Sequence, residues 1–400
     1  MREPLKRVRR RSSPSTIGVF PRDPNPYQES LYRPLRRMGF KTRYLGQMTG
    51  SHSINLVLMP VELVLLRWRG CRLLHVHWTF GFLFSGVETA PGLRRLSRQF
   101  YEFYMSLARL LGIRIVWTMH NLLPHGRTFD DDERARRFLV SHSDLIICHS
   151  EHARRALISR FGCAPSAVVI PPGPSAPDGL GVIGPPLEAQ GRRLLFLGLI
   201  EPYKGVEDLL GALQAPDLEI EVQIAGRCRD RALAARLTQL ADGLPGVSLD
   251  LGYVEDGQVG PLLERASAVV LPYREVTTSG AASLAGVAGR AVLVPDLAGF
   301  RDLPDAAVIR HPPGVEGLRA ALRRFQALDH ADLLMMGDVH RRSLVSWESA
   351  AQVTAEHFRT LVGADDVVGQ LDDRGSPTDE VIGQSDDGTP TPVPIDGKQQ

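Results

Sequence analysis

The chain has 400 residues, of which 43% are hydrophobic, so it is too long for one ordinary core and can bury two. Its formal net charge is only +2, which argues against the broad cationic surface of a nucleic-acid-binding protein. We therefore expect two domains and no nucleic-acid partner.

Residues 1–15 and 362–400 differ in composition from the rest of the chain. The first segment is rich in arginine and serine and the second in Asp, Gly, Pro and Thr, so we predict a disordered basic arm and a disordered acidic tail. The arm could contact anionic lipid at the inner face of the cell membrane, although most such arms are only solvated. No apolar stretch follows its arginines, so we expect no secretory signal and a cytoplasmic protein.

Two further observations bear on the compartment. The most apolar stretch, residues 54–66, is interrupted by Pro60 and Glu62 and is shorter than the roughly 20 residues that cross a bilayer. The cysteines are far apart and form no Cys-x-x-Cys motif, which indicates buried free thiols in a reducing compartment. They are Cys71, Cys148, Cys163 and Cys228.

Apolar runs typical of strands alternate with helical patterns through the first half of the chain. This alternation is typical of βαβ units and predicts a parallel sheet. The expected strands are Thr16–Phe20, Leu73–Val76, Arg114–Thr118, Leu145–Cys148 and Ala167–Ile170. The expected helices cover residues 28–38, 93–111, 131–142 and 150–161, where apolar residues recur at spacings of three and four. We assign a Rossmann-like domain to residues 16–172.

Polar and aromatic side chains follow two of these strands. His77 and Trp78 come after the strand that contains His75, and His120 and Asn121 follow the next strand along the chain. Ligands bind at the carboxyl ends of strands in α/β sheets, so these residues are candidates for contacts with a bound molecule. A histidine at a strand end is often only structural, which is the interpretation we favour for His75.

A dense cluster of proline and glycine, which we assign to residues 173–192, predicts a linker between the two halves. A second alternating series follows, with strands expected at Leu194–Leu197, Ile220–Ile224, Ser248–Leu251, Ala268–Leu271 and Ala291–Val294. Helices are expected over residues 206–213, 232–240 and 258–266 and after Ser279. The series predicts a second doubly wound domain, residues 193–340, and a terminal helix, residues 341–361.

The segment from Leu194 to Gly205 carries the first binding signal. A hydrophobic strand ends at Gly198, and Tyr203, Lys204 and Gly205 come just before the next helix. A permissive glycine and a cation beside the N–H groups of a helix form an anion site that suits a diphosphate. A lysine after a strand is also common on protein surfaces, so this motif does not identify the ligand alone.

A second signal lies at the same expected sheet edge. Arg274 and Glu275 follow a strand, and Ser279 is a good N-cap for a helix that begins near Gly280. The missing side chain of Gly280 would let a ligand approach the free N–H groups of that helix. A capped helix is an ordinary feature, but its position beside Lys204 favours phosphate binding.

Together these segments resemble the GT-B glycosyltransferases, in particular the family-4-like enzymes (glycosyl transferases group 1) of bacterial polysaccharide and glycolipid synthesis. The resemblance rests on residues 198–205, 224–226, 271–275 and 279–280, and on Trp347-Glu348 before the last helix. It covers roughly residues 16–361. It implies an α/β fold in which two Rossmann-like doubly wound domains face each other across a cleft.

The resemblance also implies roles for the residues. In that family these segments hold the nucleotide diphosphate and base, and the terminal helix usually returns to the N-terminal domain, which binds the acceptor. Lys204 and Arg274 would be phosphate ligands, with Glu275 near the sugar or ribose. The donor-binding residues implied are Gly198, Tyr203, Lys204, Gly205, Gly226, Arg274, Glu275, Ser279 and Gly280.

Two positions depart from the family pattern. Leu199 stands where these enzymes usually have an arginine, and Ser283 stands where they usually have a second glutamate, eight positions after Glu275. The second departure leaves open whether the sugar is transferred with retention or inversion.

Transfer with inversion needs a general base within reach of the acceptor hydroxyl, and a histidine or a carboxylate can serve. The candidates are His120, Asp130 and Glu29. Asp130 begins an acidic run that is also typical of a helix N-terminus.

The candidate acceptor contacts are Tyr27, His77, Trp78 and Asn121. Tyr27 could stack on a sugar, or it could belong to an ordinary surface turn. The arginines and aromatic residues of the helix from Leu93 could dock on a membrane interface, unless the aromatic rings lie in the core.

Four nearby histidines raise the alternative of a zinc site, but no carboxylate or cysteine stands at a known ligand spacing. We expect no metal and no cofactor, because helix dipoles and cations can stabilise a leaving diphosphate. A nucleotide diphosphate sugar would be the co-substrate, and the family analogy suggests GDP-mannose.

The resemblance thus implies transfer of a hexose to a saccharide or a lipid-linked acceptor, with possible peripheral contact to a membrane. Two alternatives stay open. A non-catalytic GT-B scaffold that binds a nucleotide sugar or a partner enzyme is favoured by Leu199 and Ser283. A nucleotide-sugar 2-epimerase would need more carboxylates in the cleft.

Overall fold

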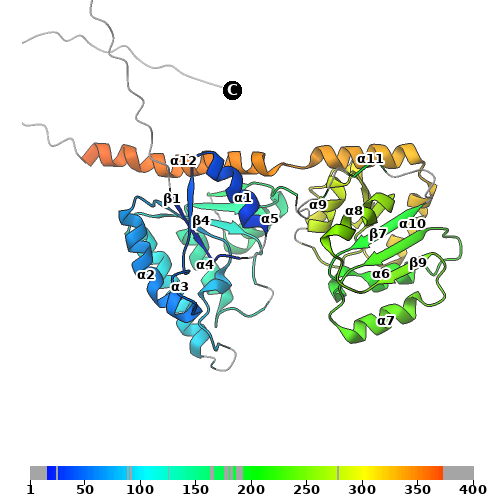
Figure 1. Cartoon of the computed structure of the whole chain (residues 1–400), viewed down its shortest axis with the longest axis horizontal. Coiled ribbons are helices and arrows are strands. Elements are labelled where there is room, and N and C mark those ends of the chain that lie inside the picture. The colour runs from blue at the N-terminus through cyan, green and yellow to red at the C-terminus, as the bar shows by residue number, and fades with distance from the viewer. Residues whose placement is uncertain are drawn as a thin grey trace, which may run out of the picture. The chain divides into compact units, whose positions relative to one another are not determined.

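The computed structural model describes residues 16–23, 26–87, 90, 92–124, 126–162, 166–174, 180, 183–185, 192–276 and 279–372. The predicted basic arm, most of the predicted linker and residues 373–400 of the predicted acidic tail lie outside these ranges. The described residues form two parallel sheets, each of six strands, and each is covered by helices (Figure 1).

The first sheet contains β1 (Thr16–Phe20), β2 (Lys41–Tyr44), β3 (Leu73–Val76), β4 (Arg114–Met119), β5 (Leu145–Cys148) and β6 (Ala167–Val169). Its strand order is β2-β1-β3-β4-β5-β6. The helices between these strands are α1 (Pro26–Arg37), α2 (His52–Trp68), the short η1 (Thr79–Phe82), α3 (Gly92–Leu110), α4 (Asp132–His142) and α5 (Glu151–Phe161).

Successive residues of each strand point to opposite faces of the first sheet, so its strands supply two separate cores. Leu73 and Val116 pack on one face with α1 and with α12 (Trp347–Asp372), which runs beside α1 in Figure 1. Leu74 and Ile115 pack on the other face with α2, α3 and α4. This burial on both faces explains why the inner strands β3, β4 and β5 are largely apolar.

The second sheet contains β7 (Arg193–Leu197), β8 (Glu221–Ala225), β9 (Val247–Asp250), β10 (Ala268–Val270), β11 (Ala291–Pro295) and β12 (Val308–His311). Its strand order, β12-β11-β10-β7-β8-β9, is that of a dinucleotide-binding fold, with the order reversing between β7 and β10. Ligands bind at such a reversal, outside the carboxyl ends of the strands.

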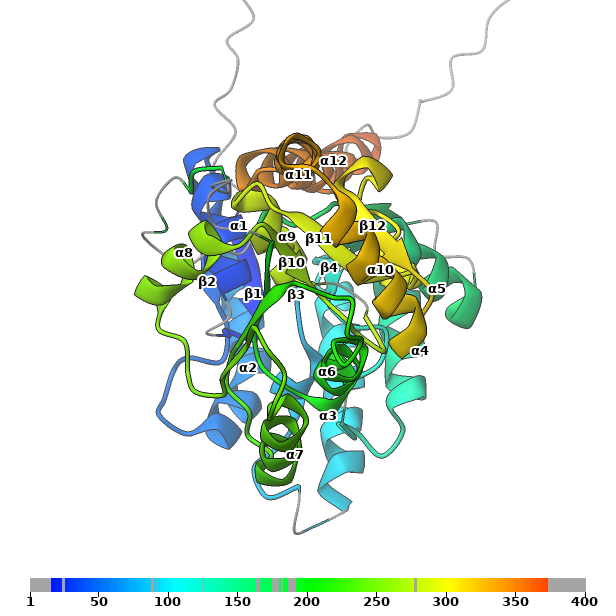
Figure 2. The same ribbon diagram turned by 90° about the vertical axis from the view of Figure 1, so that its right-hand side faces the viewer.

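Among the described residues, six longer helices and three short ones accompany the second sheet. Figure 2 shows α6 (Val206–Ala212), α7 (Arg231–Ala241) and α10 (Val315–Ala327) on one side of the sheet. On the other side lie α8 (Asp256–Arg265), α9 (Gly280–Val287) and α11 (His330–Ser343). The short helices are η3 (Pro202–Lys204), η4 (Ala298–Phe300) and η5 (Asp305–Ala307).

The last helix, α12, packs on the first sheet although it follows the second in sequence. Phe358 is fully buried in the same cluster as Ile17 and Phe40, and the indole nitrogen of Trp347 donates to the carbonyl oxygen of Pro174 at 3.0 Å. The helix continues to Asp372, past the end predicted at residue 361. Gly363 does not stop it, because one glycine in a helix interior costs only about 1 kcal/mol.

Several elements were not predicted from the sequence. The edge strand β2 consists of Lys-Thr-Arg-Tyr and has no apolar pattern, and α2 continues through Pro60. The elements β12, α10 and α11 were also missed. Within the described residues, no helix is both long enough and apolar enough to cross a membrane.

Gly226 tests how closely β7 and β8 approach at their carboxyl ends. Its φ is +154°, and a Cβ there would lie 1.8 Å from the carbonyl oxygen of Gly198. Gly226→Ala should therefore lower the free energy of unfolding by about 1–3 kcal/mol, measured by urea denaturation. The control is Gly257→Ala in α8, where a Cβ has open space and alanine should be neutral or slightly stabilising. Equal stabilities for the two variants would contradict this geometry.

Candidate functional site

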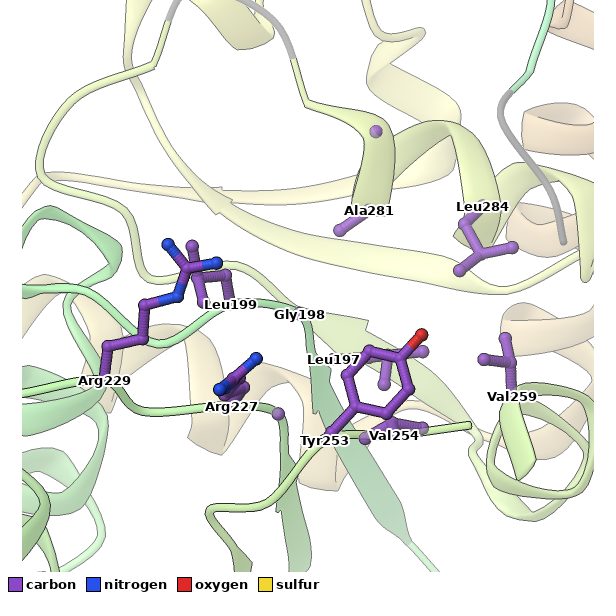
Figure 3. Close-up of a pocket in the computed structure, with 12 residues that line it drawn as sticks. Leu197, Gly198, Leu199, Arg227, Arg229, Tyr253, Val254, Val259, Ala281 and Leu284 are labelled. Atoms are coloured by element: carbon purple, nitrogen blue, oxygen red, sulfur yellow. The ribbon is translucent and has the colours of Figure 1, made fainter. Parts of the chain in front are cut away.

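A pocket of about 390 Å³ opens at the carboxyl ends of β7 and β8, beside the start of α9; we call it the α9 pocket (Figure 3). Gly198 and Gly226 form its wall at the strand ends, and Gly280 and Ala281 form the wall at the helix. It therefore brings together the predicted donor residues Gly198, Gly226 and Gly280.

One side of the α9 pocket is cationic. Arg227 and Arg229 lie within three residues after Gly226, and with Leu199 on one side of Figure 3. Both arginines are exposed, and neither forms an ion pair within the part of the chain that the structure describes. Neither arginine was predicted from the sequence, although two cations within three residues of a strand-end glycine are a recognisable signal for an anion site.

The opposite side of the α9 pocket is apolar. Val259 and Leu284 lie there, and the ring of Tyr253 stands between them and the arginines in Figure 3. Tyr253 is 63% exposed, so a face of its ring is accessible to a ligand. A tyrosine ring above apolar side chains can stack on a planar base, and the arginines suit phosphate groups. The α9 pocket thus has one side that suits the base of a nucleotide and one side that suits its phosphate groups.

Lys204 is not among the residues that line the α9 pocket. Its Nζ lies 3.8 Å from the centre of the Tyr273 ring and 5.0 Å from that of Tyr203, which is a cation–π arrangement. Burial lowers the pKa of Lys204. Gly205 permits the close turn that follows, because its φ is +69° and a Cβ there would lie 1.9 Å from the carbonyl oxygen of Pro272.

Arg274 is bound to the protein itself. Its Nε and Nη2 donate to the two carboxylate oxygens of Asp208 at 2.9 and 2.8 Å, and its Nη1 donates to the carbonyl oxygen of Pro202 at 3.2 Å. Glu275 is exposed and lines neither the α9 pocket nor the central pocket described next. The structure therefore does not bring Lys204, Arg274 and Glu275 into one pocket with the three glycines.

A second pocket, of about 550 Å³, is lined by residues that follow strands of both sheets; we call it the central pocket. Tyr27, His120 and His149 contribute from the first sheet, and Ser279 and Gly280 from the second. The hydroxyl of Ser279 caps α9 by accepting from the third N–H of the helix at 3.2 Å. Because Gly280 also lines the α9 pocket, the two pockets meet at the first turn of α9.

A chain of hydrogen-bonded rings leads from His120 into the core of the first sheet. Nε2 of His120 lies 3.2 Å from Nδ1 of His77, and Nε2 of His77 lies 2.7 Å from the hydroxyl oxygen of Tyr32. That hydroxyl lies 2.8 Å from Nδ1 of His75, whose Nε2 lies 2.8 Å from Oγ1 of Thr118.

The direction of one bond in this chain sets the direction of the others, because a neutral imidazole has one N–H and one bare nitrogen. If Tyr32 donates to His75, His77 donates to Tyr32, and His120 donates to His77. Nδ1 of His120 is then bare and can accept a proton. The opposite direction would leave a proton on that nitrogen.

Burial keeps these histidines neutral. Desolvation lowers the pKa of His75 to about 3, of His149 to about 4 and of His120 to about 2, and it lowers the pKa of His77 well below its ordinary value. His120 is therefore a hydrogen-bonding group in the free protein. A negative charge bound nearby would raise its pKa and make it a better proton acceptor.

The two predicted catalytic carboxylates lie elsewhere. Asp130 accepts from Nε and Nη2 of Arg98 at 2.7 and 3.2 Å, and these bonds lower the pKa of Asp130. Glu29 lies on the exposed side of α1 and pairs with Arg36 and, at 3.7 Å, with Arg33. Neither carboxylate lines the α9 pocket, the central pocket or the Trp78 pocket described below.

The central pocket contains two carboxylates that the sequence interpretation missed, Glu151 and Asp302. Glu151 accepts hydrogen bonds from Arg154 at 2.8 Å and from Arg155 at 3.1 Å, which lower its pKa to about 2. Asp302 is exposed between η4 and η5. Glu151 comes three residues after the end of β5, and this position at a strand end could have marked it in the sequence as a pocket residue.

A third pocket, of about 330 Å³, lies on the first sheet; we call it the Trp78 pocket. It brings together the predicted acceptor residues His77, Trp78 and Asn121. The indole of Trp78 stacks on the His120 ring, with centroids 4.3 Å apart and 12° between the planes. His120 lines both this pocket and the central pocket, and Tyr27 contacts it from the central pocket with its ring centroid 4.8 Å away.

Metal-ligand groups do not converge in the described ranges: no three His, Cys, Asp or Glu side chains there are placed to hold an ion. Cys71 and Cys148 are buried free thiols, and Cys228 is a half-buried one. Cys163 and His125, the fourth of the histidines considered for a zinc site, lie outside the described residues.

Two family models match the chain, one over each sheet. Residues 19–174 match the model described as Glycosyltransferase Family 4, and residues 191–328 match Glycosyl transferases group 1. Among curated proteins, GDP-mannose:glycolipid 4-beta-D-mannosyltransferase of Xanthomonas campestris pv. campestris is 34% identical over 104 residues. That segment covers 26% of this chain and only 30% of the mannosyltransferase.

Solved structures resemble nearly the whole described fold. Sucrose-phosphate synthase from Thermosynechococcus elongatus is 17% identical with a TM-score of 0.63, over 88% of this chain and 100% of that one. A glycosyltransferase from Rickettsia africae is 11% identical with a TM-score of 0.64, over 88% and 99%. HepE of Anabaena in complex with UDP is 14% identical with a TM-score of 0.58, over 89% and 99%. These likenesses confirm the predicted GT-B fold.

The neutral buried histidines predict acid sensitivity. Each has a pKa below the value of about 6.5 in the unfolded chain, so it takes up a proton only on unfolding as the pH falls below 6.5. The free energy of unfolding should therefore fall by up to about 1.4 kcal/mol per histidine and pH unit, measured by urea denaturation at pH 7 and 5.5. His75→Gln should reduce this slope by about one proton. A stability that is unchanged between these pH values would show that the rings are solvated.

Proposed function

Because this chain belongs to the family-4 and group 1 glycosyltransferases, we propose that it transfers a hexose from a nucleotide diphosphate sugar to a hydroxyl of a saccharide or lipid-linked acceptor. The observation that carries the proposal is that three pockets follow one another. The α9 pocket shares Gly280 with the central pocket, and the central pocket shares His120 with the Trp78 pocket. A nucleotide, a transferred sugar and an acceptor could occupy them in that order.

The donor's nucleoside would bind in the α9 pocket, with its base on Tyr253 and its diphosphate between Arg227, Arg229 and the start of α9. The N-terminal N–H groups of a helix and two unpaired cations favour a doubly charged leaving group without a metal ion. GDP-mannose is the donor we propose to test first, because the curated mannosyltransferase that this chain resembles is named for it. HepE, which resembles the chain in fold, was solved with UDP, so UDP-sugars belong in the same test.

The reaction would join the acceptor oxygen to the anomeric carbon while the bond from that carbon to the phosphate oxygen breaks. The electron pair leaves with the nucleoside diphosphate, and the hydroxyl proton passes to a base. His120 is the base we propose, because it lines the two pockets that would hold the sugar and the acceptor. The bound diphosphate would raise its pKa toward a useful value.

The alternative of a non-catalytic scaffold predicts binding without turnover. We would incubate the full chain with GDP-, UDP- and dTDP-sugars and glycolipid extract and measure nucleoside diphosphate release. Arg227→Ala should weaken donor binding about tenfold or more, since a hydrogen bond to a charged group contributes about 1.5–3 kcal/mol. His120→Ala should lower kcat about a hundredfold with little change in donor affinity.

Arg265→Ala, an exposed arginine of α8 that lines none of the three pockets, is the matched control and should behave as the wild type. Tight nucleotide binding with no release from any donor would favour the scaffold instead.

A lipid-linked acceptor would require the chain to reach a bilayer, and α2 and α3 offer a surface for this. Large apolar side chains form an exposed stripe on each helix: Ile54, Val57, Val61, Leu65 and Trp68 on α2, and Leu96, Phe103 and Leu110 on α3. The helices lie side by side in Figure 1, with Nε of Arg67 donating to the carbonyl oxygen of Leu111 at 2.8 Å. The rings of Tyr101 and Tyr104, which the sequence left open, are in the core.

The charges around these stripes favour an anionic bilayer. Glu62, the one acid in α2, is half-buried and accepts from the backbone N–H of Gly46 at 2.9 Å. Glu102, the one acid in α3, pairs with Arg98 at 2.8 Å. Arginines are the charged residues left exposed on and directly after the two helices, Arg69, Arg95 and Arg109. Apolar stripes with cations and no exposed acid are typical of surfaces that lie in a lipid interface.

Vesicle binding tests this surface. Wild-type protein should sediment with vesicles of phosphatidylglycerol and phosphatidylcholine more than with phosphatidylcholine alone. The double variant Val57→Glu/Val61→Glu should bind the anionic vesicles about tenfold or more weakly, because it adds two negative charges to the interface. Met335→Glu, an exposed apolar residue of α11, is the control and should bind as the wild type. Equal binding by all three proteins would exclude α2 as the docking face.

A further inference from the structure

The Trp78 pocket contains a buried cation that forms no ion pair within the described ranges. Arg136 of α4 lines this pocket and is only 6% exposed. Its guanidinium carbon lies 4.6 Å from the centre of the Trp117 ring, which covers one face of the group. Its Nε is buried without a hydrogen-bond partner, and no oxygen within the described ranges is bonded to its other nitrogens.

The two other buried arginines of the described chain have hydrogen-bond acceptors for their guanidinium groups. Arg98 donates to Asp130 at 2.7 Å and to Glu102 at 2.8 Å. Arg290 donates to backbone carbonyl oxygens of Leu263, Ala288 and Gly184 at 2.8–3.0 Å. These bonds explain why the two side chains can be buried as cations. No such bonds explain the burial of Arg136.

The acids near Arg136 are also committed elsewhere. Asp132, one turn earlier on α4, accepts from the backbone N–H groups of Thr128 and Phe129 at 3.1 and 2.8 Å. Glu133 pairs with Arg137 at 3.3 Å and with Arg160 at 2.6 Å. Burial lowers the pKa of Arg136, and the charge of Asp132 offsets this effect only in part.

A buried charge without a partner destabilises a protein, and such groups persist at sites where a ligand supplies the missing charge. The planar fork of a guanidinium is matched by a carboxylate or a phosphate. His77, Trp78 and His120 line the same pocket, so a ligand at Arg136 would lie on the acceptor side of the proposed reaction.

We propose that Arg136 binds an oxyanion of the acceptor, which makes the acceptor an acidic glycan or a phosphate-bearing one. That the ligand is an acceptor rests on the proposed function. That it is negatively charged rests on the buried guanidinium of Arg136. A carboxylate of an acidic sugar and a phosphate of a lipid carrier share the chemistry that the guanidinium recognises, so the test must separate them.

Binding of two matched pairs of probes tests the proposal without any turnover. The pairs are methyl β-D-glucuronide with methyl β-D-glucoside, and farnesyl diphosphate with farnesol, titrated into the full chain and followed by saturation-transfer NMR. The wild type should bind the charged member of at least one pair about tenfold to a hundredfold more tightly than its neutral partner. Arg136→Gln should lose that preference.

The pair that shows the preference identifies the ligand. A preference for the glucuronide assigns an acidic sugar, and a preference for farnesyl diphosphate assigns a phosphate group. Arg137→Gln, the adjacent exposed arginine on α4, should keep the full preference. If thermal unfolding shows that Arg136→Gln is not folded, Arg136→Lys replaces it in the test. Lysine keeps the positive charge but lacks the planar fork of the guanidinium, so this variant should show a reduced preference for the charged probe.

No preference in the wild type for either charged probe, or a preference that survives in Arg136→Gln, would overturn the proposal. Binding of GDP and UDP is measured in the same samples and should be unchanged by Arg136→Gln. Failure of the wild type to bind any nucleotide would count against the proposed function alone. The preference for charged probes tests the role of Arg136 and does not depend on nucleotide binding.

Discussion

Parallel pairing of the strands is the constraint on which the binding surfaces depend. It places the ends of β1, β3, β4 and β5 at one edge of the first sheet and the ends of β7, β8 and β10 at one edge of the second. Residues far apart in sequence, such as Tyr27, His120 and His149, therefore line one pocket. The inner strands are buried on both faces, so most of the polar groups that a ligand can reach lie where the strands end.

The same burial that stabilises the first sheet controls the chemistry of its histidines. Their rings are neutral, and the bonds through Tyr32 couple them, so that the nitrogen that carries the proton in one ring sets the choice in the others. Such an arrangement is costly in acid, because unfolding exposes several groups that then take up protons. It also holds the His120 ring in one orientation against Trp78. A positioned imidazole is a better proton acceptor than a mobile one, because its orientation need not be found anew in each reaction.

The sequence predicted the features that local patterns determine. Apolar runs located most of the strands. Glycines at strand ends and an N-capping serine marked the edge of the second sheet, where Gly198, Gly226, Ser279 and Gly280 line the pockets. The edge strand β2 was missed because its residues are polar and exposed.

Partners that come together only through the fold could not be predicted from single segments. Arg274 resembled a phosphate ligand until the structure placed Asp208 against it. Asp130 resembled a candidate base until the structure paired it with Arg98. Arg136 belongs to a helix rich in charged residues, and nothing in its local sequence separates it from the exposed Arg137. Its burial follows from the packing of α4 over Trp117.

In the proposed complex, the nucleotide of the donor lies between β7, β8 and the start of α9. Hydrogen exchange of the full chain, with and without GDP and UDP, measures this directly. With the nucleotide in this position, GDP or UDP should slow the exchange of backbone amides at residues 198–199, 226–229 and 280–283, with smaller changes in the loops of the first sheet. Protection confined to the first sheet by a nucleotide that binds would contradict it.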